Sequence, residues 1–375
     1  MTATPSLDAR RPRPRRVHPT PLPRARGPIS QALLTLLAGP PTRDPGILAA
    51  SHVTELWQVE DDVPWWRAGD DAALALVHLA ELDRRGLEGV PDGWEGHPLL
   101  ASARWSLATP LRYGLERLRE SVELPPRVTG LGVARVVVAM VAGAAEGADE
   151  PRAATCDDLV TTAVQRLRER DARAALLPRL AGTPRRLLAR TLAGDPADLA
   201  GAAGAPEAGD TERDGVGAVL RHLGLGDRTG LHLDRLPGPA LWRLALLDHL
   251  VAHRATRGVA MGWLAAADGL AASGRFATGD ALRGLGLDAA ARQAWDDCVV
   301  GRLTTLEATE SLVDAEPGLA ADVLLGARAC VTATTAVEHD LAVRSTSAAH
   351  EPHDAPDADE APGETTEVPT TEGLT

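Results

Sequence analysis

Apolar residues recur every three or four positions along most of the chain, which is the spacing of one face of an α-helix. The alternation of apolar and polar residues that is typical of strands is scarce. The pattern therefore predicts an all-α protein whose helices end near Gly and Pro residues such as Gly86, Pro125 and Pro237. The expected helices span residues 29–38, 45–60, 70–86, 97–121, 130–146, 155–175, 183–194, 214–223, 239–256, 258–272, 278–284, 288–314 and 318–343.

The helical pattern predicts a single domain over residues 29–343, interrupted by a long Gly-, Ala- and Asp-rich loop at 194–217. The two ends of the chain differ from this domain in composition and in charge. Residues 1–28 carry seven Arg in a Pro-rich setting, whereas residues 345–375 carry Asp and Glu without any Arg. Such segments lack the apolar residues needed for a core. We therefore expect a disordered arm at 1–28 and a disordered acidic tail at 344–375.

Charge, hydropathy and cysteine usage narrow the range of partners and compartments. A net charge of -13 argues against a nucleic-acid partner, because a phosphate backbone favours a basic face. The longest apolar run, Val136–Ala145, is shorter than the roughly 20 residues that span a bilayer. The three cysteines lack CxxC spacing, which excludes a zinc ribbon and a disulfide framework. The sequence thus predicts a cytoplasmic protein with no membrane partner.

Glu81 is an acid within an otherwise apolar helical pattern. It shares a helix face with Leu74 and Val77, so it is expected to point toward the core. A buried carboxylate is costly unless it is ion-paired or binds a metal. Two interpretations stay open: a buried ion pair, for example with Arg85, or a metal site in which His78 is a second ligand.

A second pattern with metal-binding spacing is the pair His249 and His253. Histidines four residues apart lie on the same face of a helix, and such pairs bind zinc in some proteins. The Glu of the HExxH motif is absent, because Leu250 follows His249. The simpler interpretation is that Asp248 caps one histidine and that the other lies near the end of the helix.

Four phrases in the chain carry a resemblance to known proteins. They are LPRARGPISQALL from Leu22, DAALALVHLAELDRRGLEGVPDGWE from Asp71, HRATRGVAMGWLAAADGLAASGRFATGDALRGLGL from His253, and LVDAEPGLAADVLLGARACV from Leu312. Taken in this order, they resemble the haem-oxygenase-like "iron-containing redox enzyme" proteins of actinobacteria. The resemblance covers most of residues 22–343 and is weakest between about 120 and 235. The chain has no Lys and no Asn, a skew that is typical of a GC-rich genome.

The resemblance implies one haem-oxygenase-like helical domain with a non-haem iron site that activates dioxygen. Glu81 matches the Glu of the family's first ligand helix, and Asp83 stands where the family has a His. His253 matches a family His, while Asp268 takes the place of a Glu. Asp195 is the one acid left of an acidic pattern near residues 190–195.

The predicted helix at 288–314 departs most from the family. The family's His, Asp and final His become Cys298, Arg302 and Thr305, and an intervening Glu becomes Val300. A guanidinium cannot ligate iron and repels it by charge. We therefore expect a lost or altered iron site in which Arg302 pairs with Glu81 or Asp268. The alternative is that Glu307 or Glu310 replaces the lost ligands one turn later.

Three functions stay open at this point. The first is a family member without iron chemistry that serves as a scaffold or partner protein. The second is an active non-haem iron oxidase or oxygenase acting on a small organic substrate, with a rearranged ligand set. The third is a helical regulator unrelated to oxygen chemistry. A homodimer is compatible with each of them. The rearranged set would draw on Glu81, Asp83, His78, His253 and Asp268.

Overall fold

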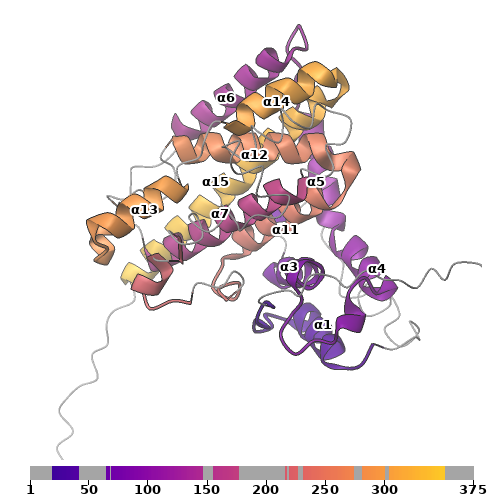
Figure 1. The fold of residues 1–375 in the computed structure, drawn as a ribbon, viewed down its shortest axis with the longest axis vertical. Helices are drawn as coiled ribbons and strands as arrows, with labels where there is room; N and C mark the ends of the chain where they lie inside the picture. Colours follow the sequence, from indigo (N-terminus) through magenta and orange to yellow (C-terminus); the bar gives the residue numbers. More distant parts are fainter. Residues whose placement is uncertain are drawn as a thin grey trace, which may run out of the picture.

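The computed structural model is built from helices (Figure 1). In the part of the chain that it describes, extended backbone is paired only in an isolated bridge between Thr20 and Leu87. The predicted all-α class is confirmed for these residues. The helices expected at 45–60 and 183–194, most of the loop at 194–217, and the outermost terminal residues lie outside the described residues. The structure describes residues 19–41, 65–67, 69–146, 155–176, 216–217, 219–226, 231–273, 281–299 and 304–350.

Short 3-10 helices join several of the longer elements. The α-helices are α1 Pro28–Ala38, α3 Asp70–Arg85, α4 Pro98–Leu107, α5 Thr109–Arg119, α6 Gly130–Glu146, α7 Cys156–Leu176, α11 Gly238–Ala252, α12 Arg257–Ala272, α13 Ala289–Val299, α14 Thr304–Ala315 and α15 Ala320–His350. The 3-10 helices are η2 Trp65–Arg67, η3 Asp92–Trp94, η5 Arg254–Thr256, η6 Ala281–Leu285 and η7 Pro317–Leu319.

Two of the long predicted helices are wrong in extent. The helix expected at 97–121 is divided into α4 and α5, because Pro110 near the start of α5 has no N–H to continue the hydrogen-bond ladder. The helix expected at 288–314 is divided into α13 and α14. Cys298 and Thr305 therefore belong to different helices, although the sequence predicted a single helix that contains both.

The helices α7 and α11 lie in the middle of the molecule (Figure 1). On one side α11 packs against α3, which in turn contacts α1 and α4. On the other side it packs against α15, which contacts α6 and α12. The helix α14 packs against α6 and α12 in turn. The buried apolar side chains of all these helices form one continuous cluster. Groups on α7 and α11 are therefore shielded from water on both sides.

The described residues include short stretches on both sides of the predicted domain at 29–343. The amide of Thr20 donates to the carbonyl of Gly86 at 3.0 Å, and that of Glu88 donates back to Thr20 at 2.9 Å. The Asp71 carboxylate on α3 accepts a 2.7 Å bond from the amide of Ile29 and so satisfies a free N–H at the start of α1. At the other end, α15 continues to His350.

One segment among the described residues, Pro317–Ser345, is long and apolar enough to cross a membrane. It consists of η7 and most of α15. Its most apolar window is 61% buried inside the protein, as is typical of a core helix.

The closest helix contact in the core joins α12 and α15. A Cβ atom built on Gly262 would lie 1.8 Å from the carbonyl oxygen of Val323, and one on Gly326 would lie 1.8 Å from that of Val259. Both obstacles are backbone atoms, so no side-chain rotation relieves the clash. The two glycines thus set the distance between α12 and α15.

We expect Gly262→Ala to lower the free energy of unfolding by at least about 2 kcal/mol, because α12 and α15 must move apart and lose packing. The matched control is Gly143→Ala in α6, where nothing lies within 4 Å of the added methyl group. That change should raise stability by about 0.5 to 1 kcal/mol through better helix propensity. Urea denaturation measures both, and equal effects would contradict the close contact.

Candidate functional site

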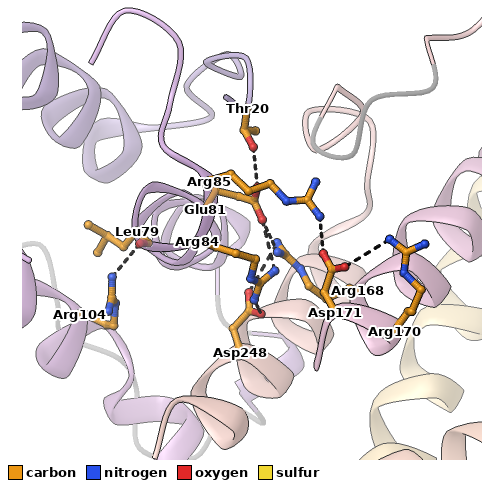
Figure 2. Close-up of polar contacts among 10 residues, drawn as sticks. All are labelled: Thr20, Leu79, Glu81, Arg84, Arg85, Arg104, Arg168, Arg170, Asp171 and Asp248. Atoms are coloured by element: carbon orange, nitrogen blue, oxygen red, sulfur yellow. Dashed lines mark hydrogen bonds and ion pairs between the residues drawn. The ribbon is translucent and has the colours of Figure 1, made fainter. Parts of the chain in front are cut away.

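Glu81 is fully buried on α3 and makes polar contacts on two sides (Figure 2). Its Oε2 accepts a 2.5 Å hydrogen bond from the hydroxyl of Thr20, which comes from the segment before α1. Its Oε1 is ion-paired with Arg168 of α7 and lies 3.4 Å from Arg84. The interpretation of Glu81 as a buried ion pair is therefore confirmed, with Arg168 and Arg84 as partners. Arg85, the partner suggested by spacing, pairs with Asp171 instead.

Asp248 of α11 completes this group, which we call the Glu81 cluster: Glu81, Arg84, Arg168 and Asp248. Asp248 accepts from Arg84 and lies 3.5 Å from Arg168. Burial alone would raise the pKa of Glu81, but Arg168 and the Thr20 hydroxyl outweigh it and hold that pKa below its usual value. Burial raises the pKa of Asp248 to about 7 despite the nearby Arg168. The cluster thus joins α3, α7 and α11 through groups shielded from water.

A second buried ionic group lies on another side of α7. Asp268 of α12 accepts from Arg173 and the Thr305 hydroxyl, and it lies 3.4 Å from Arg166. Arg166 also contacts Glu169 at 2.6 Å. Glu169 in turn accepts a 2.6 Å hydrogen bond from Arg243 of α11. We call this group the Asp268 cluster; its members are Asp268, Glu169, Arg166, Arg173 and Arg243.

The other predicted ligands lie apart from both clusters. Asp83 is exposed and pairs with Arg104 at 2.5 Å. His253 is exposed just beyond the end of α11, where its ring packs edge-to-face on His249 with 5.4 Å between centroids. The two histidines therefore do not share a helix face, because α11 ends before His253.

Several remaining predictions fall on residues that the structure does not describe. Asp195 and Arg302 lie outside the described residues, so the pairing proposed for Arg302 stays a prediction. The same holds for the side chain of Cys298, although its backbone belongs to α13. Of the two acids suggested as replacement ligands on α14, Glu307 is exposed and Glu310 is half-buried.

His78 is buried one turn before Glu81, but the two side chains are not hydrogen-bonded. Neither ring nitrogen of His78 has a hydrogen-bond partner in the described structure. Burial lowers the pKa of His78 to about 4, more than Glu81 and Asp71 raise it. The ring is therefore neutral near pH 7.

The described residues do not fit the iron site that the resemblance implies. No group of three or more His, Cys, Asp or Glu side chains among them is arranged to hold a metal ion. The two buried candidates, Glu81 and Asp268, lie in separate clusters, and each is engaged by guanidinium groups. Iron requires converging O and N ligands with free lone pairs and an open position. Nothing in these clusters supplies that arrangement.

Sequence reasoning missed the arginines of α7. Arg166, Glu169 and Arg173 recur at helical spacing, a pattern that is usually a solvated charged face. A more useful signal was in α11, where Arg243 and Asp248 interrupt a run of apolar residues. A charged pair inside an apolar run indicates buried partners elsewhere, because burial without them is too costly.

Comparisons with known proteins do not assign the chain to a family. No known protein family, curated protein or solved structure matches this chain. The resemblance to iron-containing redox enzymes therefore stays a hypothesis.

We expect Arg168→Met to lower the free energy of unfolding by about 3 to 5 kcal/mol, because it removes the buried partner of Glu81 and leaves that carboxylate only the less buried Arg84, 3.4 Å away. Adding Glu81→Gln to this variant should recover part of the loss. Arg344→Met is the control: its partner Asp340 is 2.6 Å away at the surface, and the change should cost less than about 1 kcal/mol. Urea denaturation of the four proteins checks this, and similar losses for Arg168 and Arg344 would contradict a buried pair.

The neutral, buried His78 predicts a pH dependence of stability. Its folded pKa of about 4 lies below the ordinary value of 6.5, so the unfolded chain binds protons first and stability falls as pH decreases through this range. From pH 7.5 to pH 5 the natural chain should therefore lose about 2 kcal/mol of stability relative to His78→Leu, which has no such titrating group. Denaturation at several pH values measures it. A stability difference between His78→Leu and the natural chain that does not change with pH would contradict the buried neutral ring.

Proposed function

We propose that this chain is a non-catalytic helical scaffold that acts by binding a partner, in a fold related to iron-dependent enzymes. The observation that carries the proposal is the state of Glu81 and Asp268, the two buried acids that the resemblance assigns to iron. Each is held by guanidinium groups from α7, Arg168 in one case and Arg173 in the other. These contacts supply the positive charge that a metal ion would otherwise bring to the two carboxylates.

The physical consequence of an arginine in this position differs from that of a metal ion. A guanidinium has no lone pair to offer and no open position for dioxygen or substrate. It stays protonated over the whole physiological range, so it neutralises a carboxylate permanently. Removing it leaves a buried charge without a partner, which is strongly unfavourable. The clusters are therefore suited to holding helices together and unsuited to redox chemistry.

The surface supports the binding part of the proposal. Trp105 at the end of α4 and Tyr113 of α5 are 58% and 61% exposed, and Tyr113 is the single tyrosine of the chain. The guanidinium carbon of Arg112 lies 3.7 Å from the centre of the Trp105 ring, so this indole is held in a defined position. Large exposed aromatic side chains and arginines are the residue types that dominate protein interfaces.

One observation favours the alternative, an active non-haem iron enzyme with rearranged ligands. His78 is buried beside Glu81 on α3 with both ring nitrogens free of hydrogen bonds in the described structure. An imidazole in that state is a suitable ligand for Fe(II). Under this alternative the Arg168 contact with Glu81 must open to admit the ion.

Iron analysis of the full chain separates the two functions. The protein is purified from iron-supplemented cells, incubated anaerobically with Fe(II), desalted and analysed for metal. We expect iron well below one ion per chain and no absorption change on exposure to oxygen. Glu81→Gln and Asp268→Asn are matched controls, because iron that is retained in both variants is bound elsewhere. Near-stoichiometric iron that is lost in these variants and reacts with oxygen would overturn the proposal.

A further inference from the structure

The outward face of α6 is apolar, although α6 is a surface helix. Val133, Val137 and Val141 are buried against the bundle, where α6 packs on α12, α14 and α15. On the outward face Leu131 and Val138 are 51% and 50% exposed. A surface helix ordinarily turns charged and polar residues toward water. The composition of this face is therefore that of a contact surface.

The exposed positions of α6 follow the spacing of a helix–helix contact. Leu131, Arg135, Val138 and Ala142 are all exposed and lie at i, i+4, i+7 and i+11. This spacing places them along one stripe, as in helices that pack side by side over several turns. Four of the eight large apolar side chains that are exposed in the described residues fall within residues 124–138. Such a concentration in one place marks an interaction site.

The two charged residues of α6 have opposite signs and stand near opposite ends of this stripe. Arg135 lies in the second turn of the helix and Glu146 is its last residue. Both are exposed. Eleven residues are about three helical turns, so the two side chains share a face but are about 16 Å apart along the axis. They are therefore too far apart to pair with each other within one chain.

This arrangement of charges is complementary to itself when a second α6 runs in the opposite direction. Arg135 of each copy then lies opposite Glu146 of the other, and Val138 and Ala142 fill the space between the two ion pairs. A two-fold axis produces both pairs at once, because each copy presents the same patch. A parallel arrangement would place like charges opposite each other, which is unfavourable.

We propose that α6 binds a second copy of this chain, with the two α6 helices antiparallel and the stripe from Leu131 to Glu146 as the contact. A contact of one helix with one helix is at the small end of protein interfaces, so the dimer forms reversibly with rising concentration. The inference does not rest on the proposed partner-binding surface, because it uses a different helix from those that carry Trp105 and Tyr113.

A membrane surface is a poorer match for this face than a second copy. Helices that lie on a membrane combine an apolar face with several Lys or Arg residues, which attract anionic lipids. The helix α6 has Arg135 as its single basic residue, and the chain as a whole has a net charge of -13. The repulsion between the chain and an anionic bilayer therefore opposes binding.

Sedimentation equilibrium of the full chain over a range of concentrations tests the dimer. We expect the mass to rise from one chain toward two, and Val138→Glu to remain monomeric because it places a charge at the centre of the contact. The matched control is Val343→Glu, which changes a valine of the same 50% exposure in the last turns of α15, away from α6 (Figure 1). This control should dimerise like the natural chain. A monomeric natural chain, or equal dimerisation of both variants, would overturn the proposal.

Charge reversal tests the antiparallel pairing. Arg135→Glu and Glu146→Arg should each weaken self-association about tenfold or more, since both ion pairs become like-charge contacts. A mixture of these two variants should form a heterodimer, because each pair then joins opposite charges again. The positions are exposed, and circular dichroism of each variant checks that the helices are intact. Failure of the mixture to associate would overturn the antiparallel arrangement, as would a monomer that instead co-sediments with vesicles of anionic phospholipid.

Discussion

The structure depends on the pairing of arginines on α7 with buried carboxylates on the helices around it. Arg168 reaches Glu81 on α3 and Asp248 on α11, and Arg173 reaches Asp268 on α12. A buried guanidinium is tolerated only when a carboxylate faces it, and the reverse is also true. The position of each helix therefore fixes the position of its neighbours, because sliding any one of them breaks several pairs at once.

These pairs contribute more to the choice of one arrangement than to total stability. Well-packed apolar residues in place of a buried ion pair are often as stable or more so, and we infer that the pairs here serve mainly to specify which helix faces meet. The apolar frame supplies the other part of the constraint. Gly262 and Gly326 bring α12 and α15 into backbone contact, and this frame holds Asp268 opposite α7. The close contact between α12 and α15 and the need to pair every buried charge together restrict how the helices can be arranged.

The same pairing shapes what the core is able to do. A carboxylate that binds a metal needs free lone pairs. Both oxygens of Glu81 instead contact Thr20, Arg84 and Arg168. A lowered pKa keeps Glu81 ionised, so it does not act as a proton donor near pH 7. Partner binding at the surface is a function that such a core permits, because it requires no open coordination position.

The sequence by itself determined the helical class, the bounds of α6, and the burial of Glu81, because apolar periodicity reports which face of a helix is buried. It did not determine the partners of the buried charges. Adjacent arginines point about 100° apart on a helix, so whether Arg84 or Arg85 turns toward Glu81 depends on where α7 and α11 lie. Arg168 is 87 residues away from Glu81, and no local pattern links them. Only the tertiary structure decided these pairs, since it alone sets which groups share an environment without water.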